Sequence, residues 1–210
     1  RGLGDVYKRQ LLMDSYEANK KKAPAQTVLF SSLKLWSFLL DLVESLYANE
    51  PNGIDETVKI YEEVIALKVA TPLIFINYAH FMQDRQNILE SFQIYERAIG
   101  TFPPETQYEI WNIYLAEASN EDTPLSNEHI RDLFDQALEN LVPNNIDCKS
   151  IFVLYSNFEE KCGFATRSVD ILLQGCRNTE SISNKMIMWQ ICLSKAKLLL
   201  GNSESRKFYE

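Results

Sequence analysis

Histidines, glycines and closely spaced cysteine pairs are scarce in this 210-residue sequence. The histidines are His80 and His129, and the four cysteines lie 14 to 16 residues apart, with no C-x-x-C pair. A zinc site or a histidine-dependent active site needs such side chains close together, so we expect neither. We interpret the cysteines as free thiols in a reducing compartment. They are Cys148, Cys162, Cys176 and Cys192.

Long apolar runs and catalytic motifs are missing too. No run approaches the roughly 20 apolar residues of a membrane-spanning helix, so we expect no membrane association. The sequence has no H-E-x-x-H metal motif, no G-x-x-x-x-G-K-[ST] phosphate loop and no G-x-G-x-x-G after a strand pattern. It therefore predicts a protein that is not an enzyme and has no cofactor, no metal and no small-molecule substrate.

An excess of positive charge is also absent, since the formal charge at pH 7 is −8. Proteins that neutralise phosphates are expected to be basic, so we expect weak direct RNA binding. Between Glu105 and Glu160 there are twelve acidic residues and two basic ones, Arg131 and Lys149. We interpret this stretch either as a solvated face or as a surface for a basic protein segment. The candidate contact residues are Glu105, Glu109, Glu117, Glu121, Asp122, Glu128, Asp132 and Asp135.

The two ends of the chain differ from the rest. Residues 1–10 do not share the periodicity that follows, and we interpret them as a non-native, adapter-derived leader. Residues 11–34 are expected to be a linker and the end of a preceding repeat. The chain stops at Glu210 within a helical pattern, so we expect the last repeat to be truncated.

Apolar residues from about residue 35 onward recur at helical spacing, and no sustained two-residue alternation predicts a strand. The first such run is Leu35, Trp36, Leu39, Leu42 and Leu46. Pro- and Asn-containing turns separate the runs. Asp55 and Ser126 are candidate N-caps, and Pro72 is expected at the first position of a helix. We expect surface roles for His80 and His129, the latter beside a helix start.

Large residues recur along this pattern in two series. In the first helix of each pair, two of them lie three positions apart, and the leading one recurs every 36 to 41 residues. In the second helix, one apolar residue recurs every 34 to 39 residues. The first series is Trp36/Leu39, Phe75/Tyr78, Trp111/Tyr114, Phe152/Tyr155 and Trp189/Cys192, and the second is Tyr61, Tyr95, Phe134, Leu172 and Tyr209. We interpret both series as packing anchors of a repeat, because their spacing places them on one helix face.

A repeat of this length is typical of α-solenoids, in which each helical hairpin buries its apolar face against its neighbours. The sequence therefore predicts an all-α, right-handed solenoid of stacked antiparallel hairpins over residues 35–210, with about five repeats. Such arrays present a long surface on which extended or helical protein segments lie. The expected role is a protein scaffold.

The hairpins resemble the half-a-TPR (HAT) repeat of RNA-processing proteins, whose first helix reads W-x-x-Y and whose second reads roughly R-x-x-[IV]-[YF]-E-R-A-[LI]. Residues 92–99 (FQIYERAI) and 131–138 (RDLFDQAL) match the second helix. Residues 111–114 (WNIY) and 152–160 (FVLYSNFEE) match the first. The pair Glu159-Glu160 falls on the acidic tail of that motif, so we expect a structural or surface role for it.

Residues 32–46, 70–81 and 90–97 resemble segments of a narrower family, the large HAT-repeat splicing factors of the NineTeen complex. This family is called Syf-one in yeasts and XPA-binding protein two in animals. The resemblance covers about residues 28–210 and is most specific through Phe102. It implies a nuclear, structural subunit of the spliceosome-associated NineTeen complex, with other HAT-repeat and Myb-like splicing proteins as partners and RNA nearby.

The later repeats depart from the family pattern. Leu172, Leu173 and Gly175 replace the Tyr, Glu and Ala of the fourth second-helix motif, and Cys192 replaces the Tyr of the fifth first helix. We expect these changes to affect partner contacts rather than the fold.

Three other functions remain open on the sequence. One is a HAT scaffold of another RNA-processing complex, in mRNA 3'-end cleavage or ribosomal-RNA maturation. A TPR-type co-chaperone would need a basic clamp for a carboxylate, which the acidic centre disfavours. A direct RNA-binding module would use the stretch from Lys185 to Lys207, which has five basic residues and one acidic residue.

Overall fold

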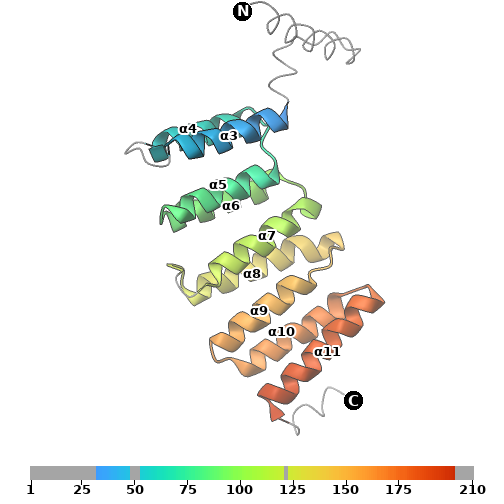
Figure 1. The fold of residues 1–210 in the computed structure, drawn as a ribbon. Coiled ribbons are helices and arrows are strands. Elements are labelled where there is room, and N and C mark those ends of the chain that lie inside the picture. Colours follow the sequence, from blue (N-terminus) through green and yellow to red (C-terminus); the bar gives the residue numbers. More distant parts are fainter. Residues whose placement is uncertain (1–31, 48–52, 121–122, 202–210) are drawn as a thin grey trace, which may run out of the picture. The chain divides into compact units, whose positions relative to one another are not determined.

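A computed structural model describes residues 32–47, 53–120 and 123–201, and every regular element in these ranges is helical (Figure 1). The all-α fold of helical hairpins is therefore confirmed. The elements are α3 (Leu33–Tyr47), α4 (Gly53–Ala66), α5 (Pro72–Asp84), α6 (Ile88–Thr101), α7 (Pro104–Ala118), α8 (Asn127–Leu141), the 3₁₀ turn η1 (Val142–Asn144), α9 (Lys149–Lys161), α10 (Ala165–Asn178) and α11 (Ile182–Leu199).

The chain divides into two compact units, Arg1–Ile74 and Phe75–Glu210, and the boundary falls in the first turn of α5. The expected leader, residues 1–10, lies outside the described residues, as does most of the expected linker. Helix α3 begins at Leu33, inside the segment 11–34 that we expected to precede the array.

The described part of the first unit is the hairpin of α3 and α4. Its buried residues are Leu40 and Val43 from α3 and Tyr61 and Val64 from α4. The Tyr61 hydroxyl donates a hydrogen bond to the Glu44 carboxylate and so ties the two helices together.

The core of α3 differs from the predicted stripe. Trp36 and Leu39 are half-buried, whereas Leu35, Leu42 and Leu46 are exposed. The buried residues of this helix, Leu40 and Val43, are displaced by one position from the predicted stripe. Because one residue corresponds to about 100° around a helix axis, a shift of one position moves the stripe to a different face.

The second unit contains the hairpins α5–α6, α7–α8 and α9–α10, followed by α11, as successive layers (Figure 1). Each second helix contacts the next first helix, as in the pairs α6 and α7, α8 and α9, and α10 and α11. The first helices α7 and α9 also contact each other. Aromatic rings fill these interfaces: Tyr95 stacks on Tyr114 with centroids 5.3 Å apart, and Phe134 stacks on Tyr155 at 4.5 Å.

The helix starts follow local capping chemistry in part. Helix α5 begins at Pro72 as predicted, and the Ser126 side chain caps α8 by accepting a hydrogen bond from the His129 backbone N–H at 3.3 Å. The N-cap expected at Asp55 is wrong, because α4 already begins at Gly53. Asp55 instead lies in the first turn, where its negative charge favours the positive end of the helix dipole.

Candidate functional site

The structure gathers no metal-binding cluster in the part of the chain it describes. Across residues 32–47, 53–120 and 123–201, no group of three or more His, Cys, Asp or Glu side chains could hold a metal ion. His80 on α5 and His129 on α8 are both exposed. None of the described helices combines the length and apolarity needed to span a membrane.

Most of the predicted repeat anchors lie in the cores of the hairpins. The buried anchors are Tyr61, Phe75, Tyr78, Tyr95, Trp111, Tyr114, Phe134, Phe152, Tyr155 and Leu172. In α11 the predicted pair behaves differently at its two positions: Cys192 is fully buried, whereas Trp189 is half-buried and its neighbour Met188 is fully buried in its place. Tyr209 lies outside the described residues. Because these rings pack against one another, few of them can contact a partner protein or stack on a nucleic-acid base.

The acidic residue that follows an aromatic anchor has a specific contact in two repeats. The Tyr114 hydroxyl on α7 donates a hydrogen bond to Glu96 on α6, at 3.3 Å. In the next repeat Tyr155 on α9 lies close enough to Asp135 on α8 to lower the pKa of its carboxyl. The acidic position of the second-helix motif thus meets the following hairpin at these two junctions.

A buried ion pair lies where α8, α9 and α10 meet. The Glu159 carboxylate has no solvent exposure and accepts two hydrogen bonds from Arg131, from Nε at 2.7 Å and from Nη2 at 3.0 Å. This two-point geometry is the strongest that an arginine and a carboxylate form. It raises the pKa of the Arg131 guanidinium above its ordinary value.

Further groups complete this ion-pair network. Arg167 Nε lies 3.3 Å from Glu159 Oε1, and Arg167 also donates to the Tyr155 hydroxyl at 3.2 Å. The Arg131 guanidinium lies over the Phe164 ring, 5.1 Å from its centroid, and donates to Glu128 at 2.8 Å. The sequence suggested a structural or surface role for Glu159, but neither its partners nor its complete burial.

Glu160, the next residue of α9, pairs with α11. Its carboxylate lies 2.6 Å from Lys195 Nζ on α11, and the same ammonium group donates to Asn157 at 2.6 Å and to Ser156 at 3.1 Å. Lys195 therefore holds two first helices together. In the predicted basic stretch Lys185 and Lys195 are half-buried and Lys197 is exposed, and the residues from 202 onward lie outside the described residues.

The candidate acidic surface separates into parts. Glu105 and Glu109 are exposed on α7, and Glu117 near the end of that helix is half-buried. Glu128 and Asp132 are exposed on α8. Glu121 and Asp122 lie outside the described residues.

Asp135, also on α8, is exposed but already interacts with Tyr155 and Arg167. Partial burial raises the pKa of its carboxyl, while Tyr155 and the charge of Arg167 lower it. The net direction is upward. A partner would therefore compete with Tyr155 and Arg167 for this carboxylate.

Glu139 was missed among the candidate contacts. With Glu128, Asp132 and Asp135 it forms a row at spacings of four, three and four residues, which places all four on one face of α8. Helical spacing alone would have identified this row, which we call the α8 acidic row. Of the nearby cations, Arg131 binds both Glu159 and Glu128, the first member of the row, and Lys149 donates to Asn184 at 3.4 Å.

The four cysteines are free thiols. Cys148, Cys176 and Cys192 are buried, and Cys162 is half-buried. Burial raises the pKa of Cys148 to about 11, and burial with the neighbouring Cys176 raises that of Cys192 to about 12. Such thiols are poor nucleophiles at neutral pH.

Comparison with known proteins gives a consistent picture. The family model described as "Pre-mRNA-splicing factor Syf1/CRNKL1 C-terminal HAT repeat" matches residues 7–210. The match therefore includes the last residues of the segment 1–10 that we interpreted as a leader.

The curated relatives are likewise named pre-mRNA-splicing factors. The chain is 44% identical to the pre-mRNA-splicing factor SYF1 of Eremothecium gossypii, covering 96% of this chain and 24% of that protein. It is 42% identical to SYF1 of Saccharomyces cerevisiae, over 96% of this chain and 25% of the relative. It is 34% identical to the splicing factor cwf3 of Schizosaccharomyces pombe, over 96% of this chain and 26% of the relative. The chain thus spans about a quarter of the length of these relatives. On the match of the family model and these identities, the chain belongs to the Syf1/CRNKL1 C-terminal HAT-repeat family of pre-mRNA-splicing factors.

Proposed function

We propose that this chain is part of a non-catalytic scaffold in pre-mRNA splicing. The observation that carries the proposal is family membership across residues 7–210, with relatives that are themselves named pre-mRNA-splicing factors. The scaffold would be a subunit of the nuclear, spliceosome-associated NineTeen complex, equivalent to Syf-one of yeasts and XPA-binding protein two of animals. Its partners would be other HAT-repeat and Myb-like splicing proteins.

The use of side chains in the second unit supports a scaffold rather than an enzyme. The aromatic anchors, the carboxylate of Glu159 and the ammonium group of Lys195 are engaged between helices. Reactive groups in an active site instead converge on an accessible cleft. We infer that the repeat anchors maintain the array and that partners contact the outward residues.

The α8 acidic row is the surface we propose for a basic partner segment. Its four carboxylates are exposed on one face, and two of them already have a cation near them: Arg131 binds Glu128 as well as Glu159, and Arg167 acts on Asp135. Asp132 and Glu139 are the members of the row best placed to meet a basic segment.

The same charge opposes RNA, because RNA is bound tightly when cationic side chains neutralise its phosphates and release their counterions into solution. Filter binding of the 210-residue chain to single-stranded RNA should give a Kd weaker than about 1 μM at physiological salt. Tighter binding would contradict this surface assignment.

Segment exchange tests the proposed function. Residues 11–210 would replace the matching segment of Saccharomyces cerevisiae SYF1, and splicing of a reporter intron would be measured. If the chain is a splicing scaffold, we expect intron retention within about twofold of the unmodified strain. A chimera present at normal levels that leaves the intron unspliced, as a deletion of the segment does, would contradict the proposal. The control is the same exchange made with a HAT array of an unrelated RNA-processing factor.

A further inference from the structure

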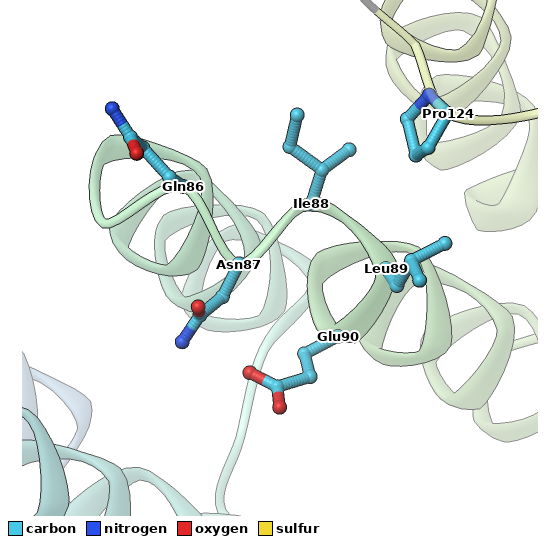
Figure 2. Close-up of a pocket in the computed structure, with 6 residues that line it drawn as sticks. All are labelled: Gln86, Asn87, Ile88, Leu89, Glu90 and Pro124. Atoms are coloured by element: carbon cyan, nitrogen blue, oxygen red, sulfur yellow. The ribbon is translucent and has the colours of Figure 1, made fainter.

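A pocket of about 380 Å³ lies at the ends of two consecutive hairpins of the second unit (Figure 2). Its walls come from residues 86–90, where α5 turns into α6, and from Pro124 in the loop between α7 and α8. We call it the loop-end pocket. The scaffold role proposed above does not involve the loop-end pocket.

The lining of the loop-end pocket toward Pro124 is apolar. Figure 2 shows Ile88 and Leu89 on the side of the turn that faces Pro124, while Asn87 and Glu90 point to the opposite side. Leu89 is 58% exposed although the other exposed residues of α6 are polar or glycine. Small-molecule sites have polar groups placed inside the cavity to orient the ligand. Because the walls toward Pro124 are apolar, they favour binding of an apolar side chain.

Hydrogen bonds hold the backbone around the pocket in place. Gln86 has a φ of +66°, which turns the chain out of α5, and the Asn87 N–H donates to the Met82 carbonyl at 2.9 Å. On the α6 side the Ser91 hydroxyl donates to the Ile88 carbonyl at 2.7 Å. Across the pocket, the Leu125 N–H donates to the Thr123 hydroxyl at 3.4 Å. A pocket formed before binding loses less conformational entropy when a partner arrives.

The exposed charged side chains nearest the pocket in sequence are mainly acidic. Glu90 is exposed beside it, and Glu128, the first member of the α8 acidic row, follows Pro124 by four positions and is paired with Arg131. Arg85 is the cation next to the turn, and its guanidinium lies over the Phe81 ring, 4.9 Å from the centroid. A second copy of the chain would bring like charges together, so the complementary occupant is cationic.

We propose that the loop-end pocket binds one apolar side chain of a lysine- or arginine-rich segment of a partner protein, whose cations face Glu90 and the α8 acidic row. This inference rests on the proposed scaffold function and specifies the chemistry of one partner. The apolar side chain supplies affinity through buried area, and the surrounding charges supply orientation and association rate.

Peptide selection tests the proposal. Random peptides displayed on phage are selected on the 210-residue chain, and the most enriched peptide is synthesised with a fluorophore for anisotropy titration. We expect enrichment of peptides with an apolar residue flanked by Lys or Arg. Leu89→Ser should weaken binding about tenfold, because a leucine contact is lost. Glu90→Lys should weaken it several-fold at low salt, with a smaller effect at high salt.

Two matched variants control for general effects. Leu198→Ser removes another exposed leucine, on α11, and Asp170→Lys reverses an exposed charge on α10. Both should bind the peptide like the parent chain. Thermal melting checks that all four variants are folded, as expected for exposed positions.

Three outcomes would overturn the proposal. One is the enrichment of acidic or neutral peptides, or of none. Another is equal weakening by Leu89→Ser and Leu198→Ser. The third is self-association in light scattering that Leu89→Ser abolishes, which would make a second copy the occupant. Failure of the scaffold function is distinguishable, because segment exchange would then fail while the basic peptide still binds at Leu89.

Discussion

Glu159 illustrates how a single residue can be decisive for this fold. Its carboxylate is fully buried between α8, α9 and α10, and a buried charge is tolerated only when it is paired and hydrogen-bonded. Arg131 supplies two hydrogen bonds, and Arg167 adds a third contact. Removing the carboxylate would leave the buried Arg131 charge without its main partner.

Glu159→Gln should lower the free energy of unfolding by about 3–5 kcal/mol, the usual cost of breaking a buried ion pair. Urea unfolding followed by circular dichroism measures it. The adjacent Glu160→Gln is the control, because its pair with Lys195 is partly exposed and such pairs contribute about 1 kcal/mol or less. Equal losses for the two variants would refute the role assigned to Glu159.

Gly175 is a second residue whose identity has a steric reason. A Cβ atom at this position would lie 2.6 Å from Met188 Cε and 2.9 Å from Phe152 Cγ. The family pattern has alanine here, and this chain brings α9 and α11 too close for one. The departure noted in the sequence is therefore explained by the packing of its neighbours.

Gly175→Ala should lower the free energy of unfolding by about 1–3 kcal/mol through overpacking. Gly100→Ala in α6 should raise it by about 0.4–1 kcal/mol, because nothing lies within 4 Å of the added carbon and alanine favours helix. Thermal melting of both variants shows the opposite signs. A stabilised Gly175→Ala protein would show that the close approach of α9, α10 and α11 is wrong.

Among elements, the recurring unit is the junction between one hairpin and the next. The acidic residue after the anchor of a second helix meets the tyrosine of the following first helix in the pairs Glu96 with Tyr114 and Asp135 with Tyr155. At the next junction both halves change together, since Leu173 replaces the acid and Cys192 the tyrosine. At that junction the buried thiols of Cys176 and Cys192 lie close enough to affect each other's pKa.

Tyr114→Phe should lower the free energy of unfolding by about 1 kcal/mol, because the hydrogen bond to Glu96 is lost at a buried ring. A double-mutant cycle with Glu96→Ala should return most of that value as coupling. Tyr95→Phe is the matched control: its ring stacks on Tyr114, but its buried hydroxyl has no hydrogen-bond partner in the described part of the chain. A larger loss for Tyr95→Phe than for Tyr114→Phe would contradict this account of the junctions.

Sequence periodicity identified the helices and their pairing well, because a buried stripe recurs at a fixed spacing whatever its neighbours are. It located Tyr95, Trp111 and Tyr114 in the core, where the structure buries them. It was less successful at Trp36 and Trp189, which are half-buried. In those helices aliphatic residues occupy several faces, so ring size was a poor guide to the buried one.

At the scale of the whole molecule, interactions between helices distant in sequence could not be predicted. The contacts of Glu159 with Arg131 and of Glu160 with Lys195 span 28 and 35 residues and depend on how hairpins stack. The loop-end pocket likewise joins residues 86–90 to Pro124. Composition did indicate the acidic centre, and its helical spacing indicates the α8 acidic row.

Buried thiols and phenols should make the whole molecule less stable at alkaline pH. Burial raises the pKa values of Cys148 and Cys192 to about 11 and about 12, and those of Tyr95 and Tyr114 also rise. Each group is neutral when protonated, and the unfolded chain releases these protons at lower pH, from about 8.5 for cysteine and 10 for tyrosine. The unfolded state then binds fewer protons, so the free energy of unfolding falls as pH rises above about 8.5.

Urea unfolding at pH 7.5, 9 and 10.5 measures this dependence. Stability should fall across the series, and Cys192→Ala should show a shallower slope although it is less stable at pH 7.5. A slope unchanged by the substitution would contradict the burial of this thiol.

The claim that the chain is a protein scaffold of splicing is tested most directly by affinity purification. Tagged residues 11–210 would be incubated with nuclease-treated nuclear extract, and the captured proteins identified by mass spectrometry. We predict recovery of HAT-repeat and Myb-like splicing proteins, undiminished by the nuclease because protein contacts hold them. Recovery of chaperones or of 3'-end cleavage factors instead, or loss of every splicing protein after nuclease treatment, would contradict the account.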